Sequence, residues 1–220
     1  MLVVGFDTAT PAVSAALHDG ARVVSSALTV DARRQGELLA PMIAKVLADA
    51  GATRADLTGV AVGVGPGPYT GLRVGLVTAR VLGAVLGVPV YGVCTLDVIA
   101  AQAEVNRPRP GFLVATDARR KEVYWARYDA DGRRIEGPAV GAAAAIDGAP
   151  GLPVAGDGGR LYPDAFGPAI EPAYPDARTL CEIVTRQLAA TGQPELLPPE
   201  PLYLRRPDAR EPGVPKRVTP

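Results

Sequence analysis

The sequence contains few of the residues that most enzymes use for catalysis. Its 220 residues include one histidine, His18, and two cysteines, Cys94 and Cys181, which form no C-x-x-C pattern. A two-histidine metal site is therefore excluded, and a catalytic triad would depend on His18, which we expect to be exposed beside a turn. The cysteines are interpreted as buried thiols in a reducing compartment. Hydrolase chemistry is not favoured.

Net charge and aromatic side chains are also scarce. The 23 basic and 23 acidic residues cancel, and aromatic residues make up 5% of the chain. Autonomous nucleic-acid binding depends mainly on phosphate neutralisation, so the neutral balance gives no general reason to expect it. We find no secretory signal, and Arg73 and Arg80 interrupt the longest apolar run. We therefore expect a cytoplasmic protein without a membrane span.

Strands and helices alternate along the chain in two similar series. The first series is predicted to have strands at 2–7, 13–17, 22–30, 58–64 and 89–93, with helices at 37–50, 70–86 and 95–104. The second is predicted to have strands at 112–117, 122–128, 133–140 and 153–155, a helix at 176–190 and a last strand at 202–204. Each series contains a hairpin, a strand, a glycine loop and a helix. This order predicts a degenerate internal duplication of two α/β lobes, with chance similarity as the alternative.

The lobes are separated by a Pro/Gly-rich segment, Asn106–Gly111, which is typical of a hinge or linker. We assign residues 1–105 to an N-terminal lobe with a Gly/Pro loop and residues 106–200 to a degenerate second lobe. Residues 201–220 are expected to form a C-terminal strand and a mildly basic tail that returns to the N-terminal lobe.

A glycine loop joins the strand at 58–64 to the helix at 70–86. Such a junction can hold a phosphate on free backbone N–H groups. The loop lacks the Lys and Ser/Thr of a Walker A motif, and Pro66 and Pro68 have no N–H to donate. A tight turn that lets the helix pack is an equally good interpretation. The candidate nucleotide-contacting residues are Asp7, Gly65, Gly67, Thr70 and Arg73.

Asp7 and Asp117 each follow a predicted strand. A carboxylate at this position can hold a metal or water beside a phosphate when a glycine lies two residues later. Ala9 and Arg119 occupy that position here, and a Cβ would obstruct the phosphate. We therefore interpret both aspartates as turn-capping residues in preference to metal-associated carboxylates.

The helix at 70–86 has small residues every four positions and no polar face. Glycine within a helix costs about 1 kcal/mol relative to alanine, so several glycines require a compensating close contact. A helix that is apolar all round is expected to be buried all round. We favour a seam with another chain over burial between lobes of the same chain, and expect Gly75→Leu or Gly83→Leu to abolish pairing without unfolding the lobe. The predicted interface comprises Leu39, Met42, Ile43, Val46, Gly71, Leu72, Gly75, Leu76, Ala79, Leu82 and Gly83.

A basic turn, Arg119-Arg120-Lys121, precedes the aromatic strand at 122–128. This segment could contact RNA through phosphate binding by the turn and base stacking on the aromatic residues. The strand alternates apolar residues on both faces, so a packed strand with a solvated turn is the favoured interpretation.

The central string Val62-Gly63-x-Gly65-Pro66-Gly67-Pro68-Tyr69-Thr70-Gly71-Leu72-Arg73-x-Gly75 resembles the signature of the bacterial TsaB (YeaZ) family. Asp7-Thr8-Ala9-Thr10, Asp117-Ala118-Arg119 and Pro201-Leu202-Tyr203-Leu204-Arg205 are similar to that family too. The resemblance implies an actin-like fold of two RNase H-like lobes, with mixed sheets flanked by helices.

The resemblance also implies a function. TsaB proteins are non-catalytic partners in making threonylcarbamoyladenosine in tRNA. They pair through N-lobe helices with the catalytic subunit TsaD, or with themselves when TsaD is absent, and the ATPase TsaE joins the pair. No intrinsic cofactor or metal is implied, although ATP or ADP could bind at the shared interface, and tRNA is reached through the complex.

Departures from the family pattern weaken the case for independent nucleotide chemistry. Pro68 replaces the usual Ser, Gln35 replaces a frequent His, and Lys121 replaces the usual Gly. Three alternatives stay open. They are a small actin-like ATPase or kinase acting through Asp7 and the Gly65–Gly67 loop, a degenerate metallopeptidase homologue, and direct tRNA binding through Arg119–Lys121 or the tail.

Overall fold

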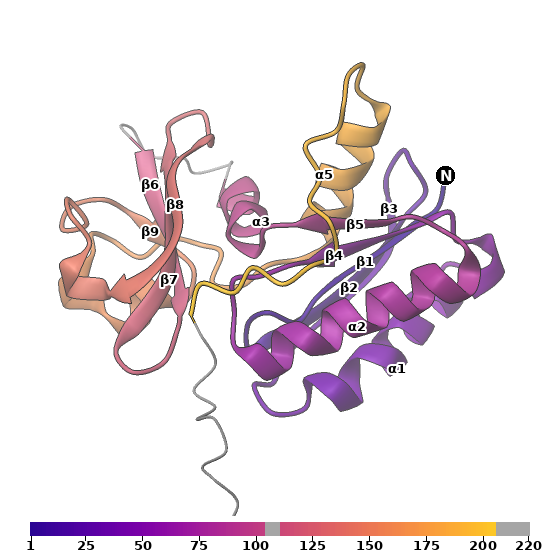
Figure 1. Ribbon diagram of the computed structural model, residues 1–220, viewed down its shortest axis with the longest axis horizontal. Coiled ribbons are helices and arrows are strands. Elements are labelled where there is room, and N and C mark those ends of the chain that lie inside the picture. Colours follow the sequence, from indigo (N-terminus) through magenta and orange to yellow (C-terminus); the bar gives the residue numbers. More distant parts are fainter. Residues whose placement is uncertain (104–110, 206–220) are drawn as a thin grey trace, which may run out of the picture.

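The first lobe is built on a five-stranded mixed sheet (Figure 1). The computed structural model describes residues 1–103 and 111–205. The strands are β1 (Val3–Asp7), β2 (Ala12–His18), β3 (Val23–Val30), β4 (Gly59–Gly63) and β5 (Val90–Val93). They lie in the order β3–β2–β1–β4–β5. β1 pairs antiparallel with β2 and parallel with β4, so β1 is the central strand of the lobe.

The second lobe repeats this arrangement in reduced form. Its strands are β6 (Gly111–Asp117), β7 (Glu122–Asp129), β8 (Arg134–Ala142) and β9 (Val154–Ala155), in the order β8–β7–β6–β9. β6 pairs antiparallel with β7 and parallel with β9, as β1 does with β2 and β4. The predicted duplication is confirmed by this shared order and direction. The helix after β9, α4 (Gly158–Leu161), is a single turn. Single-turn 3-10 helices lie at Arg54–Asp56, Ala143–Ala145 and Pro163–Ala165.

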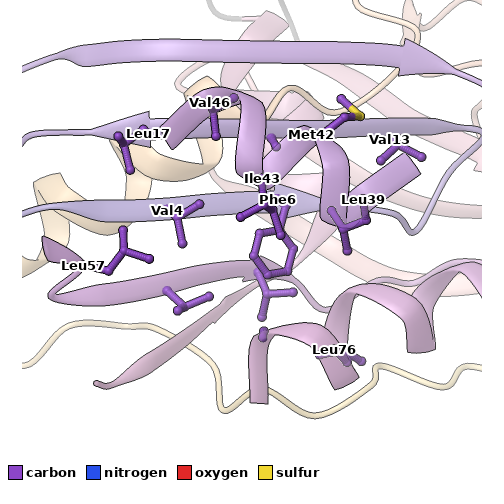
Figure 2. Packing of buried hydrophobic residues seen from close by; sticks show 14 of the residues in the cluster. Val4, Phe6, Val13, Leu17, Leu39, Met42, Ile43, Val46, Leu57 and Leu76 are labelled. Atoms are coloured by element: carbon purple, nitrogen blue, oxygen red, sulfur yellow. The ribbon is translucent and has the colours of Figure 1, made fainter. Parts of the chain in front are cut away.

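Helices cover both faces of the first sheet. On one face, α1 (Gln35–Asp49) and α2 (Tyr69–Leu86) pack against Val4 and Phe6 (Figure 2). On the other, α3 (Thr95–Gln102) and α5 (Ala177–Ala189) pack against Val3 and Ala61. Because successive strand side chains point to opposite faces, both faces of β1 must be apolar. This explains why the first strand lacks apolar–polar alternation.

The assignment of residues 106–200 to the second lobe is wrong for α5. A Cβ on Gly5 would lie 2.4 Å from the Cys181 Sγ, so α5 lies directly on β1. Leu180 belongs to the same apolar cluster as Val3. The helix predicted at 176–190 is thus no counterpart of α2, and Figure 1 shows it beside the first sheet.

The C-terminal segment returns along the first lobe without forming the strand predicted at 202–204. Leu197 forms an isolated bridge with Gly92, and the Leu202 N–H donates to the Val64 carbonyl at 2.9 Å. Leu202 contacts the apolar clusters of both lobes. The tail at 206–220 and nearly all of the predicted linker lie outside the described residues.

The glycine stripe of α2 faces the chain's own first lobe. The Thr8 hydroxyl donates to the Gly71 carbonyl at 2.7 Å and accepts from the Gly75 N–H at 3.0 Å. A Cβ on Gly75 would lie 2.7 Å from the Thr8 Oγ1, so this close approach requires glycine. α2 is long and apolar enough to span a membrane by length and composition, a test that core helices also pass, and 33% of it is buried.

Candidate functional site

The glycine loop between β4 and α2 is packed against the start of the chain. A Cβ on Gly67 would lie 2.1 Å from the Ala9 carbonyl oxygen, so the two backbones touch. The Gly65 N–H donates to the Thr95 hydroxyl at 3.2 Å. Pro66 adds no donor. The Ala9 backbone therefore closes the Cα side of Gly67 to a phosphate.

Asp7 is fully buried beneath this loop. Its Oδ1 accepts the Ala9 N–H at 2.7 Å, and its Oδ2 accepts the Thr95 hydroxyl at 2.7 Å. Burial raises the pKa of Asp7, although these two hydrogen bonds lower it. The turn-capping interpretation is confirmed by the bond to Ala9. The Asp7 carboxylate makes internal hydrogen bonds and is not exposed to solvent.

The remaining nucleotide candidates lie at the surface. Thr70 and Arg73 are exposed on the first turns of α2. The Arg73 guanidinium lies 4.0 Å from the centre of the Tyr69 ring, and its Nε donates to the Tyr203 hydroxyl at 3.2 Å. The structure thus separates Thr70 and Arg73 from the buried Asp7, Gly65 and Gly67.

Two cavities lie between the lobes, on either side of Pro68 and Arg119. The first, of about 150 Å³, is lined by Thr8, Thr10, Pro11, Ala32, Arg33, Gln35, Pro68, Thr70, Gly71, Asp117 and Arg119. The second, of about 210 Å³, is lined by Gly67, Pro68, Tyr69, Ala118, Arg119, Arg120, Tyr124, Leu202, Tyr203, Leu204 and Arg205. Four arginines and one aspartate line the pair. Arg119 is ion-paired with Asp117 and Arg205 with Glu122, which leaves an excess of positive charge.

Asp117 and Asp157 meet at the corresponding corner of the second lobe. The Asp117 N–H donates to the Asp157 Oδ1 at 3.1 Å, and the Asp117 Oδ1 accepts the Arg119 N–H at 2.8 Å. The latter bond confirms Asp117 as a turn-capping residue. Burial raises the pKa of Asp157 to about 6, with a smaller contribution from the charge of Asp117. Asp157 was not among the site residues predicted from the sequence.

Asp157→Asn is expected to stabilise the protein at neutral pH and not at pH 4. The pKa of Asp157 is raised on folding, so the stability of the wild type falls as pH rises from about 4 through 6. A shift of about two units corresponds to at most ~3 kcal/mol. Thermal melts at pH 4 and pH 7 measure this, and the variant should melt several degrees higher only at pH 7. Equal differences at both pH values would contradict it.

The opposite face of α2 is an exposed apolar stripe. Val77, Val81 and Val85 are 59%, 54% and 77% exposed, one helical turn apart. A groove of about 500 Å³ runs beside it between α1 and α2, and its lining includes Ile43 and Leu82. Within the single chain α2 is therefore not buried all round, and the expected seam with another chain, which would cover this face, stays a prediction. The i, i+4 spacing of the valines was the available signal for this surface.

Most of the predicted interface residues are instead part of the monomer's own core. Leu82 is half-buried, and the others are buried. The glycine face of α2 was the wrong choice for the interface, because it packs closely against Thr8 and β4 of the same chain. The apolar face of α1 likewise covers the first sheet. The buried residues of this set are Leu39, Met42, Ile43, Val46, Gly71, Leu72, Gly75, Leu76, Ala79 and Gly83.

The histidine and cysteines are also internal. His18 is 4% exposed, contrary to expectation, and its Nδ1 accepts the Gly20 N–H at 3.0 Å. Cys94 and Cys181 are free and buried, as predicted, and burial raises the pKa of Cys94 to about 12. Within residues 1–103 and 111–205, no three His, Cys, Asp or Glu side chains are placed to hold a metal.

Comparisons with known proteins identify the family. Residues 29–167 match the model of TsaD, the tRNA N6-adenosine threonylcarbamoyltransferase. An uncharacterised protein of Mycobacterium tuberculosis (strain ATCC 25618 / H37Rv) is 48% identical over 94% of this chain and 93% of its own length. The TsaB protein of Escherichia coli (strain K12), named for tRNA threonylcarbamoyladenosine biosynthesis, is 36% identical over 60% of this chain and 56% of its own.

A solved structure agrees with this result. YeaZ from Pseudomonas aeruginosa has a TM-score of 0.77 and 28% sequence identity, covering 92% of this chain and 99% of that one. The match extends over both lobes, so it includes the loop, the interlobe cleft and α2. The chain therefore belongs to the TsaD-related TsaB (YeaZ) family and has its actin-like fold.

Proposed function

We propose that this chain is a non-catalytic scaffold subunit in the synthesis of tRNA threonylcarbamoyladenosine. It pairs with a TsaD-like catalytic subunit, is joined by a TsaE-like ATPase, and forms a homodimer when alone. tRNA is reached through the complex. The interface that the subunits share is the place where ATP or ADP would bind. The observation that carries this proposal is the exposed valine stripe of α2, which follows a glycine loop packed against Ala9.

The stripe has the character of an interface. Val77, Val81 and Val85 project from a rigid helix, and the α1–α2 groove continues the apolar surface. Covering a valine side chain contributes roughly 1.5 kcal/mol or more, so this row favours association with another apolar helix pair. A paralogue with a related first lobe offers such a pair.

The loop supports a non-catalytic role. Both oxygens of the Asp7 carboxylate accept internal hydrogen bonds, from Ala9 and Thr95, and the Ala9 carbonyl closes the Cα side of Gly67. A phosphate approaching Gly67 from that side would require the loop to separate from Ala9. These contacts favour a scaffold over the alternative of an ATPase acting through Asp7.

The lone purified chain is expected to hydrolyse ATP no faster than a buffer blank containing Mg²⁺. The reason is the glycine loop packed against Ala9 and the internal hydrogen bonds of Asp7. Phosphate release measured at 1 mM ATP, before and after addition of the TsaD-like and TsaE-like proteins, tests this. Hydrolysis by the lone chain that Asp7→Ala abolishes would reverse the assignment.

Co-expression tests the scaffold itself. The chain, its TsaD-like paralogue and its TsaE-like ATPase are purified together and their masses measured by light scattering, with and without ATP. We expect a stable pair with the paralogue, to which the ATPase adds when ATP is present. Elution of the chain alone under all conditions would refute the proposed function.

A further inference from the structure

An exposed stack of two tyrosines and one arginine stands at the mouth of the interlobe cleft. The rings of Tyr69 and Tyr203 lie 5.1 Å apart at 24°, and the Arg73 guanidinium lies 4.0 Å from the Tyr69 ring centre. Tyr69 is 39% exposed and Tyr203 is 42% exposed. Because Tyr69 stacks on one face of the Tyr203 ring, a planar ligand would have to use the rest of the exposed Tyr203 surface.

The stack is held firmly in place. Tyr69 is the first residue of α2, and Arg73 lies one turn further along the same helix. Tyr203 follows Leu202, whose N–H donates to the Val64 carbonyl. The Arg73 Nε bond to the Tyr203 hydroxyl ties the two segments together. The platform is therefore preorganised, and a ligand need not order it on binding.

A strained basic turn lies beside the same cavity as this stack. Arg119, Arg120 and Lys121 have φ values of 63°, 58° and 62°, a left-handed conformation that residues with side chains adopt rarely. The turn is fixed because the Glu122 N–H donates to the Arg119 carbonyl at 3.0 Å and the Arg205 Nη1 donates to the Ala118 carbonyl at 3.0 Å. All three cationic residues are exposed.

One cavity joins the two features. The lining of the space of about 210 Å³ includes Tyr69 and Tyr203 together with Arg119, Arg120 and Arg205. The adjoining cavity of about 150 Å³ adds Arg33, with Asp117 as the acidic residue of its lining. An exposed aromatic face beside several cations is the combination that binds single-stranded nucleic acid.

We infer that this cleft mouth binds a single-stranded segment of RNA, with one base stacked on Tyr203 and phosphates at the Arg119–Lys121 turn. The inference rests on the proposed function and names RNA as a direct contact of this subunit. A base offers an aromatic face that can stack on Tyr203, and successive phosphates offer negative charges that can pair with the Arg119–Lys121 turn. An acidic peptide would use the cations and leave the platform unused.

Fluorescence anisotropy with a labelled single-stranded RNA of seven nucleotides tests the inference. The full chain at 50 mM salt is expected to bind with a dissociation constant in the micromolar range. If the turn neutralises about three phosphates, the logarithm of affinity should fall with the logarithm of salt with a slope of about −2. A duplex RNA of equal length should bind at least fivefold more weakly, because its bases are already stacked.

Variants separate stacking from charge. Tyr203→Ala should weaken binding at least fivefold, whereas Tyr203→Phe, which keeps the ring, should stay within about twofold. Arg120→Glu with Lys121→Glu should weaken binding at least tenfold. Arg22→Glu with Arg133→Glu, a charge-matched control at exposed turns elsewhere, should have less than a twofold effect. Melting temperatures check that every variant is folded.

Three results would overturn the inference. They are no binding by the wild type at 50 mM salt, equal binding by Tyr203→Ala and the wild type, and competition by free ATP as strong as by the RNA. The last would mark a site for a small nucleotide. Co-purification with the TsaD-like paralogue is a separate measurement, so a lost RNA contact with retained pairing leaves the proposed function standing.

Discussion

Gly75→Leu is expected to destabilise the monomer by about 3 kcal/mol or more. A Cβ at this position would lie 2.7 Å from the Thr8 Oγ1. That hydroxyl accepts a hydrogen bond from the Gly75 N–H and donates one to the Gly71 carbonyl. Forcing bulk into a packed site costs roughly 1–3 kcal/mol, and each buried hydrogen bond lost adds about 1 kcal/mol. The expectation from sequence alone, that this change would leave the lobe folded, is therefore corrected.

Urea denaturation of the purified variant measures the effect. Ala84→Leu is the control, because it places the same leucine side chain on the same helix at an exposed position. We expect the control to stay within about 0.5 kcal/mol of the wild type. If Gly75→Leu and Ala84→Leu unfold at the same urea concentration, Gly75 does not need to be glycine for packing.

Val81→Asp is expected to weaken pairing with the TsaD-like subunit at least a hundredfold while leaving the monomer intact. Val81 lies in the middle of the exposed stripe, and burying its side chain contributes roughly 1.5 kcal/mol or more to association. An aspartate there would also have to lose water without a partner charge, which costs several kcal/mol more. Since 54% of Val81 is exposed in the monomer, folding should change little.

Titration of the labelled paralogue with each variant measures the dissociation constant. Ile135→Asp is the control, because Ile135 is a 61% exposed aliphatic residue on β8 of the second lobe. It should pair like the wild type. Equal affinity for Val81→Asp and the control, with both proteins folded, would show that the partner does not use this face of α2.

Much of the fold follows from local sequence patterns. The hairpin β2–β3 is predicted by the Asp19-Gly20 turn between apolar runs, and β1 is predicted by its unbroken apolar segment. The repeated order of elements predicts two similar sheets. These features depend on residues close together in the chain, which explains why sequence reasoning identified them.

The predictions that failed concern which surfaces of the helices pack against which parts of the chain. The stripe at Gly71 and Gly75 shows that something approaches α2 closely, but it does not distinguish Thr8 of the same chain from a second chain. The position of α5 on β1 depends on contacts between Gly5 and Cys181, far apart in sequence. Asp157 was missed because a single aspartate in a glycine loop has no periodic signal.

The packing of α5 on β1 has a consequence for biosynthesis. All five strands of the first sheet have been made once β5 emerges, yet α3 covers only part of the face that contains Val3 and Ala61, and the rest waits for Leu180 and Val184 of α5. On the ribosome, the earliest-made lobe must therefore wait for nearly the last-made helix. During that interval the apolar face of the sheet is exposed, where chaperones can bind it and other chains can aggregate with it.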